Sequence, residues 1–431
     1  MEYKAEIFDQ LQMLYETTGF NDHQLHCVMR FPTCLDTDIL RQAFLTSIEA
    51  IPILGTRYVD DTRRPRWEST DPSRREEAFV IARTERELDG FVTSRIDETR
   101  GPQVRACLLG SGVPTLALNM NHMVSDGAGF KAYLYFLCDI YTRLVSGANP
   151  RPAPIVGNRG MEGVLEHFSA VTKLSALVRQ SAESNASGKF RFPLGDDGDL
   201  QPFILTHSLA RERTAALKAY SKARAATLND VVLTAYYRCL FRRLALPEGT
   251  VLRIPLMVDM RRYGVAGADF TTLSNLSSTV TVGLNCRPNE EFADTLERIR
   301  TEMARKKISN IGLNAFVKLD LLFRLFPNGR ANHRLKTGLK NPLICMTNVG
   351  ILDSIRLSFA GIRPHDAFVC GSIKHKPHFQ LAVSTYEGEL TFSSNLYGSP
   401  TDRERISTFL EEIEKELNEA AHAGHSLAAA F

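Results

Sequence analysis

Apolar residues recur along the chain at two spacings, and segments with one spacing alternate with segments that have the other. Short continuous or alternating apolar runs predict strands, whereas apolar residues three and four positions apart predict helices. Leu40, Phe44 and Ile48, for example, share one face of a predicted helix at a spacing of four. In the first third of the chain the pattern predicts strands at 24–31, 53–59, 103–109 and 114–121, and helices at 36–50 and 130–144.

The same alternation returns after residue 200. Strands are predicted at 203–208, 251–258, 276–282, 343–347, 379–385 and 390–397, and helices at 211–223, 228–245, 289–306, 315–326 and 402–421. Between the halves, prolines and glycines interrupt regular structure, and 163–178 alone has a helical pattern. The charged stretch 60–77 is predicted to be an exposed loop.

These patterns predict an α/β protein with two lobes. Residues 1–145 and 200–431 each contain enough strands for a mixed sheet flanked by helices, and residues 146–199 form the crossover between them. The length of 431 residues also favours two lobes, because one hydrophobic core seldom organises so long a chain.

Composition narrows the class of protein. Hydrophobic residues make up 44% of the chain and charged residues 23%, the balance of a globular protein with an ample core. The net charge is only +3 and basic residues are interspersed with acidic ones, so nothing favours a nucleic-acid partner. The start lacks a basic segment followed by an apolar one, and no run approaches the roughly 20 apolar residues of a membrane span. We therefore expect neither a signal peptide nor a transmembrane segment.

The cysteines and histidines point to neither disulfides nor a metal. The eight cysteines contain no CxxC pair and several fall in apolar segments, which is typical of reduced thiols in a cytoplasmic protein. His23, His26 and Cys27 are close in sequence but lie along one alternating strand, which would distribute them over both faces. The sequence therefore predicts a cytoplasmic protein without a metal site.

The most informative segment is 121–127, with the sequence NHMVSDG, and it has two interpretations. It places His122 at the end of an apolar strand and Asp126 four residues later, at a glycine turn that leads into a helix. Histidine is the side chain best suited to take and return a proton near neutral pH. The alternative is a strand-end histidine followed by Ser125 or Asp126 as an ordinary helix cap, and the spacing by itself does not choose between the two.

Several further segments, taken in order, decide the interpretation. They are 35–43 (LDTDILRQA), 51–54 (IPIL), 101–106 (GPQVRA), 227–232 (TLNDVV), 254–261 (IPLMVDMR), 275–278 (NLSS), 347–350 (TNVG) and 386–390 (YEGEL). Together with His122 and Asp126 they resemble the HxxxD acyltransferase superfamily with the chloramphenicol-acetyltransferase-like fold, which includes condensation domains, alcohol acetyltransferases, polyketide-associated acyltransferases and wax-ester synthases. One departure is that the frequent HHxxxDG of the family begins with Asn121 here, although the second histidine, which does the chemistry, is present.

The resemblance implies a tunnel between two lobes and a set of roles. His122 would be the general base, and Asp126 would support the turn by pairing with Arg261, unless it only caps the helix. Gly127, at a helix start with free N–H groups, is a candidate oxyanion donor. Ser277, Ser278 and Asn348 are candidate substrate-binding residues on second-lobe segments, although each side chain is as readily satisfied by a local turn.

We expect a stand-alone acyltransferase that moves an acyl group from a coenzyme A or carrier-protein thioester to an alcohol or amine. The co-substrate would be acyl-CoA or a phosphopantetheine-linked acyl group, with no tightly bound cofactor. One alternative is a trans-acting condensation enzyme that forms an amide between two carrier-bound substrates. Another is a non-catalytic recruitment module, although such a protein could lose His122 freely. No GxSxG elbow surrounds a serine, which argues against a serine hydrolase.

Overall fold

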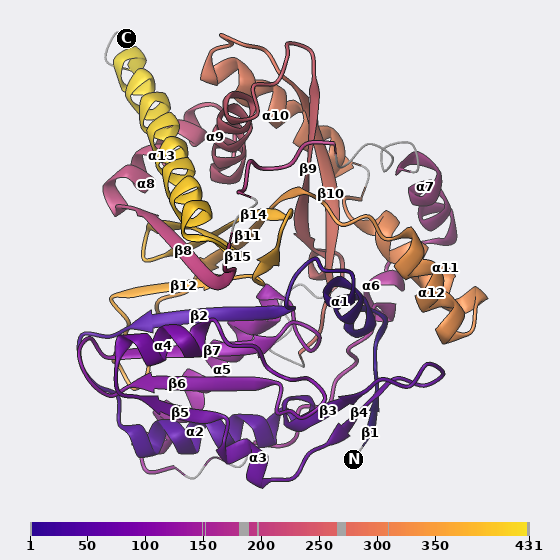
Figure 1. The fold of residues 1–431 in the computed structure, drawn as a ribbon, viewed down its shortest axis with the longest axis vertical. Coiled ribbons are helices and arrows are strands. Elements are labelled where there is room, and N and C mark those ends of the chain that lie inside the picture. The colour runs from indigo at the N-terminus through magenta and orange to yellow at the C-terminus, as the bar shows by residue number, and fades with distance from the viewer. Residues whose placement is uncertain are drawn as a thin grey trace.

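Two lobes stack on one another and are joined by crossing segments (Figure 1). The computed structural model describes residues 2–428 except 149, 151, 181–188, 196–197, 265–272 and 309, so part of the predicted crossover lies outside the described residues. The two large sheets are separate, as the sequence predicted. Among the described residues, no helix combines the length and apolar character that a membrane crossing requires.

The first lobe is built on a five-stranded sheet with the order β12-β2-β7-β6-β5. These strands are Asp366–Cys370, Gln24–Arg30, Thr115–Asn121, Val104–Leu109 and Phe79–Ala82, in the same order. Helices α2 (Thr37–Ala50) and α5 (Gly127–Val145) pack on one face of the sheet, and the shorter α4 (Glu85–Val92) packs on the other. Because helices cover both faces of this sheet, β2 and β7 are almost continuously buried.

Strand β12 comes from the second half of the chain but lies in the first sheet. Phe368 pairs with Val28 in an antiparallel ladder along β2, and its side chain is buried. An unpaired edge on β2 would expose a row of backbone donors and acceptors, which β12 satisfies. The sequence division at residue 200 did not anticipate this exchange, because 366–370 is a short segment whose sequence gives no sign of which sheet it joins.

The second lobe contains a seven-stranded mixed sheet with the order β10-β9-β11-β14-β15-β13, and β8 also pairs with β15. The strands are β8 (Gln201–Leu209), β9 (Val251–Asp259), β10 (Ser277–Asn285), β11 (Ile344–Leu352), β13 (Lys374–His375), β14 (Phe379–Tyr386) and β15 (Glu389–Gly398). Helices α8 (Arg211–Ala223), α9 (Leu228–Arg243), α10 (Phe292–Ile308) and α13 (Pro400–Ala428) flank it. Two mixed sheets with flanking helices confirm the predicted fold class.

A third, three-stranded sheet replaces part of the loop predicted at 60–77. It has the order β1-β4-β3, with strands Glu2–Lys4, Arg66–Ser69 and Thr56–Val59, and the short helix α3 (Ser73–Glu76) follows. The prediction of an exposed loop was wrong because Trp67, within the charged stretch, is fully buried. Its indole N–H donates to Asp9 at 2.8 Å, which anchors the strand to the first helix.

The first helix, α1 (Ile7–Thr17), lies where the two lobes meet (Figure 1). Phe8 packs against Phe316 of α11 (Leu313–Leu325), with ring centroids 4.9 Å apart. The same small core includes residues of α6 (Glu162–Leu165) and α7 (Ala170–Gln180), and α12 (Asn328–Gly338) follows α11. The single helix predicted at 163–178 is thus two helices. Because α1 fills the space between the lobes, it also forms a wall of the cavity described next.

Candidate active site

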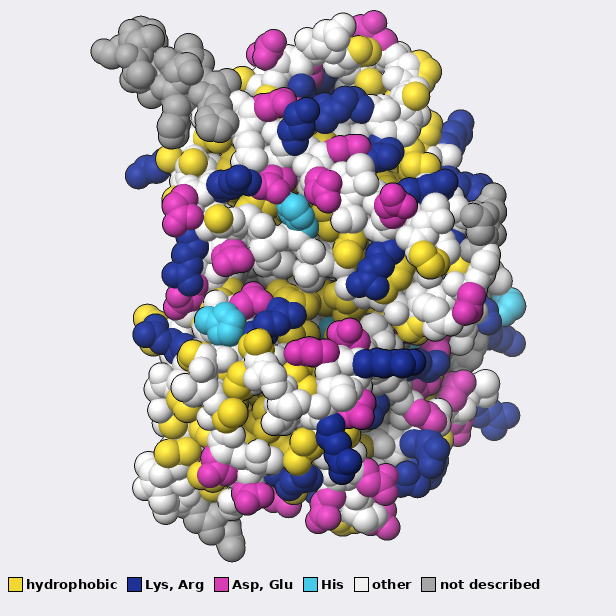
Figure 2. Space-filling view, turned by 60° about the vertical axis from the view of Figure 1, so that its left-hand side comes forward, with side chains coloured by type: hydrophobic (Ala, Val, Ile, Leu, Met, Phe, Trp, Pro, Cys, Tyr) yellow, Lys and Arg dark blue, Asp and Glu magenta, His cyan; other side chains and the backbone are white. Residues whose placement is uncertain are grey.

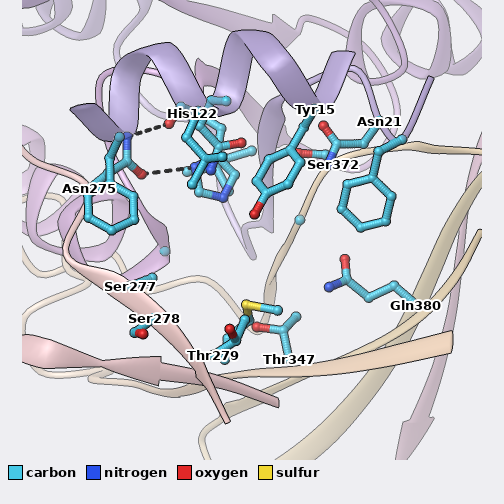
Figure 3. Close-up of a pocket in the computed structure, with 18 of the residues that line it drawn as sticks. Tyr15, Asn21, His122, Asn275, Ser277, Ser278, Thr279, Thr347, Ser372 and Gln380 are labelled. Atoms are coloured by element: carbon cyan, nitrogen blue, oxygen red, sulfur yellow. Dashed lines mark hydrogen bonds between the residues drawn. The ribbon is translucent and has the colours of Figure 1, made fainter. Parts of the chain in front are cut away.

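A cavity of about 200 Å³ lies between the lobes. Its walls come from α1, from the turn after β7, from β10 and β11, and from the segment that follows β12. His122 is among the lining residues, and Figure 3 shows its ring between α1 and the strands of the second lobe. The structure therefore places the predicted base where molecules bound between the lobes can meet it.

The end of strand β7 fixes the position of His122. Asn121 is the last residue of β7 to pair with β2, opposite Gln24. The next backbone N–H, that of His122, donates to the carbonyl of His23 at 2.7 Å. The chain then turns into α5, so the imidazole projects from the end of a rigid sheet.

Asn275 fixes the tautomer of the imidazole. Its Nδ2 donates to the carbonyl oxygens of His122 at 2.7 Å and of Met123 at 2.8 Å, which orients the amide. Its Oδ1 therefore faces Nδ1 of His122, 3.2 Å away, and accepts a hydrogen bond from the Nδ1–H group (Figure 3). A neutral imidazole with a proton on Nδ1 keeps its lone pair on Nε2. Nε2 makes no hydrogen bond to the described residues, so it is available to a substrate.

Burial holds the pKa of His122 below its ordinary value. Loss of solvent is the largest influence and the positive charge of Lys374 adds to it, whereas hydrogen bonding to its own carbonyl, the charge of Asp126 and the hydrogen bond to Asn275 only partly offset them. The imidazole is consequently neutral at pH 7. A neutral imidazole is the form that accepts a proton.

Asp126 is buried and points away from the cavity. Its Oδ1 accepts from the backbone N–H of Gly129 at 3.0 Å, so it caps α5. Its Oδ2 accepts from Leu276 N–H at 2.8 Å and from the Ser277 hydroxyl at 3.2 Å. These two oxygens tie the histidine turn to the start of β10, so the side chain is both a helix cap and a bridge between lobes.

Arg261 forms the expected ion pair with Asp126. Its Nη1 lies 2.9 Å from Oδ2 of Asp126 and 3.1 Å from Oδ1 of Asp259. Its Nη2 donates to the Ser274 carbonyl at 2.9 Å and hydroxyl at 3.1 Å. The guanidinium therefore does not hold one carboxylate with two nitrogens. It spans separate partners, and it fastens the segment that carries Asn275.

Gly127 is the first residue of α5 and lines the cavity. Its backbone N–H makes no hydrogen bond to the described residues, as is usual in the first turn of a helix. A Cβ at this position would lie 3.6 Å from Val349 Cγ1, so a side chain there would extend towards the second lobe. The N–H therefore remains a candidate oxyanion donor.

The three predicted substrate-binding residues differ in their surroundings. Ser277 and Ser278 both line the cavity, but their hydroxyls donate to Asp126 and, at 2.6 Å, to the Gly312 carbonyl. Asn348 is exposed and does not line the cavity, since its amide bonds to Asn229 at 3.0 Å. The structure brings the two serines to the cavity and leaves Asn348 outside it.

Comparison with solved structures places this arrangement among known folds. The first condensation domain of the calcium-dependent antibiotic synthetase, in complex with a substrate analogue, has a TM-score of 0.72 and 16% identity over 98% of this chain and 96% of its own. Trichothecene 15-O-acetyltransferase from Fusarium sporotrichioides has a TM-score of 0.68 and 13% identity over 97% and 95%. The starter condensation domain of rhizomide synthetase, an R148A mutant in complex with C8-CoA, has a TM-score of 0.66 and 13% identity over 97% and 96%.

The chain has the condensation-domain and acyltransferase fold. No family model and no curated protein matches the sequence. The structural matches confirm, over nearly the whole chain, the fold that the sequence resemblance implied.

Within the condensation-domain fold, several lining residues were not singled out from the sequence. Asn275 stood inside a matched segment, yet its role as the partner of the imidazole was missed. Tyr15 comes from α1, whose helical pattern was not recognised, and burial raises its pKa to about 12. Lys374 and Ser372 follow β12, the strand that was not predicted.

A second cluster of titratable groups lies in the first lobe. Glu16, His23 and Glu98 bring ligand atoms within 4.8 Å of one another, close enough in principle for a metal ion. Arg95 already pairs with both glutamates, and its Nη2 lies 2.8 Å from Glu98. Arg95 therefore supplies the positive charge that the two glutamates require, and we assign the cluster as an ion-pair network.

Proposed function

We propose that the chain is an acyltransferase that moves an acyl group from a thioester of coenzyme A or a carrier protein to an alcohol or amine. The observation that carries this proposal is the neutral imidazole of His122. Its Nε2 makes no hydrogen bond to the described residues, and the ring lines a cavity between the lobes. The likeness to condensation domains and to an O-acetyltransferase supports the same class of reaction.

The reaction needs a base at the acceptor and a donor for the developing oxyanion. Nε2 of His122 takes the proton of the alcohol or amine as its oxygen or nitrogen attacks the thioester carbonyl. The Gly127 N–H stabilises the tetrahedral oxyanion, since it is a free donor at a helix N-terminus. When the C–S bond breaks, the imidazolium returns the proton to the leaving thiolate. No acyl-enzyme forms in this scheme.

A thiol-release assay tests the proposal. Purified protein is mixed with acyl-CoA and panels of alcohols and amines, and a thiol reagent reports free CoA while mass spectrometry identifies the acylated product. We expect CoA release that depends on the acceptor. Turnover with acyl groups on a carrier protein and an amine on a second carrier, but none with CoA, would favour the condensation enzyme. Absence of both products would favour the recruitment module.

The pH dependence of turnover follows from the pKa of His122. The neutral imidazole is the active form and its pKa is lowered by burial, so kcat/KM should fall only on acidification below the ordinary histidine value of about 6.5. Above that pH, the profile should be flat until other groups titrate. A pH profile measured with an alcohol acceptor checks this. An acid limb centred above the ordinary value would contradict the proposed environment.

Asn275→Ala tests whether the amide positions the base. Loss of a hydrogen bond that fixes the tautomer should lower kcat about 10-fold or more. The bond from Asn275 raises the pKa of His122, so its removal should also move the acid limb of the kcat/KM profile to lower pH. A purely structural role would lower activity without moving the limb. Asn275→Asp is the comparison variant: its carboxylate keeps an acceptor beside Nδ1, and its negative charge should move the acid limb to higher pH instead.

A further inference from the structure

A buried lysine lines the same cavity as His122. Lys374 lies on β13, is 4% exposed, and places Nζ 3.9 Å from the centroid of the Phe20 ring. Within the described part of the chain its ammonium makes no hydrogen bond and no salt bridge. Its backbone pairs with Asn21, another lining residue, so the position of the side chain is fixed from both sides of the lobe interface.

The cavity offers this ammonium no counter-charge. No aspartate or glutamate is among the described residues that line it. Asp22 is the carboxylate whose charge reaches Lys374, but it does not line the cavity and forms no salt bridge with Lys374 among the described residues; its Oδ1 accepts from Ile373 N–H at 2.9 Å. Buried lysines are rare unless they are paired, because an unpaired charge is costly to remove from water. An anionic ligand would provide the missing partner.

Ser372 supplies a second donor beside the lysine. It is 3% exposed, it lines the cavity, and its hydroxyl has no hydrogen-bond partner among the residues that the structure describes. Ser372 and Lys374 flank Ile373, which is fully buried and does not line the cavity. In the view of Figure 3, Ser372 and Asn21 lie on the other side of His122 from Asn275. An ammonium and a hydroxyl that line one cavity match the two oxygens of a carboxylate.

We propose that Lys374 and Ser372 bind a carboxylate carried by one of the two substrates of the reaction. This inference rests on the proposed function, and it adds that either the acyl group or the acceptor is acidic. A carboxylate fits better than a phosphate, because one lysine neutralises a single negative charge and the cavity contains no second cation besides it among the described residues.

Binding measurements separate the two sources of the carboxylate. Calorimetry with the full chain compares succinyl-CoA with butanoyl-CoA in the donor arm. The acceptor arm compares L-alanine with L-alaninamide, and L-lactate with L-lactamide. In one arm we expect the carboxylate to bind about 10- to 100-fold more tightly than its neutral counterpart, the range of a charge-assisted hydrogen bond. Equal binding in both arms would overturn the inference.

Lys374→Met should abolish that preference while it leaves the neutral ligands unchanged. The variant keeps the length of the side chain and removes a buried charge, so its unfolding temperature should be no lower than that of the wild type. Ser372→Ala is the second variant and should weaken carboxylate binding about 3- to 10-fold. The matched control is Lys336→Met, which removes the same charge from an exposed position on α12 and should retain the full preference. A preference that survives Lys374→Met would refute the assignment.

The inference and the proposed function can fail separately. His122→Ala should bind the carboxylate ligands as the wild type does, because its imidazole is not part of the anion site. A wild-type protein that prefers carboxylates but transfers no acyl group would refute the proposed function alone. A protein that transfers acyl groups with equal preference for neutral and acidic substrates would refute the carboxylate site alone.

Discussion

His122→Ala should fold normally and lose roughly 10²- to 10⁴-fold in kcat, the usual share of general acid–base catalysis. Besides its own carbonyl, the side chain hydrogen-bonds to Asn275, while the backbone of the turn is held by His23 and by the amide of Asn275 itself. Circular dichroism should therefore give an unchanged melting curve, and the thiol-release assay should show the loss. A folded variant with wild-type turnover would assign the base role to another group.

Ser125→Ala is the matched control for that measurement. Ser125 is fully buried, its hydroxyl donates to the Asp126 carbonyl at 3.0 Å, and it does not line the cavity. No covalent intermediate is proposed, so this variant should keep nearly wild-type turnover. A large loss on Ser125→Ala with no loss of stability would instead point to a serine nucleophile.

Asp126→Ala should be the most destabilising single substitution at the site. It leaves the Arg261 guanidinium with the more exposed Asp259 as its remaining carboxylate partner, and the N–H groups of Gly129 and Leu276 without acceptors. Removal of one member of a buried pair typically costs about 3–5 kcal/mol, and the 23% exposure of the Arg261 side chain places the expected loss at about 3 kcal/mol. Chemical denaturation of the variant gives the free energy of unfolding.

A double-mutant cycle tests the interaction itself. Because the unpaired charge is removed along with its partner, Asp126→Ala combined with Arg261→Ala should be less destabilising than the sum of the two single changes. Arg261→Lys should also lower the free energy of unfolding, since a single ammonium cannot span both Asp126 and Ser274 as the guanidinium does. Additive free energies of unfolding would mean that the two side chains do not interact, and that Asp126 acts only through its bonds to α5 and to the start of β10.

The sequence predicted those parts of the site that lie on strongly patterned elements. Strand β7 and helix α5 are continuous apolar segments on either side of a glycine turn, so the position of His122 followed from local patterns alone. Asp126 and Arg261 are far apart in sequence, and only the resemblance joined them. The structure then showed that the guanidinium has two further partners, Asp259 and Ser274, that no local signal marks.

The missed elements have physical reasons. Helix α1 buries Asp9, Gln10 and Gln12 along with its apolar residues, so its buried face does not look hydrophobic. Strand β12 exists because β2 has an edge to be covered, which is a property of the tertiary structure. Lys374 was missed because a lysine in a sequence is ordinarily taken to lie at the surface.

Strand β12 belongs to the first sheet although it comes late in the chain, and this has a consequence for synthesis on the ribosome. The first 360 or so residues emerge before the edge of β2 can be covered, since its partner strand begins at Asp366. During that interval the nascent chain presents an unpaired apolar edge, a surface that chaperones bind and that other nascent chains can pair with. The first lobe is therefore completed late, although it is translated first, and a fragment that ends before residue 366 exposes an edge prone to aggregation.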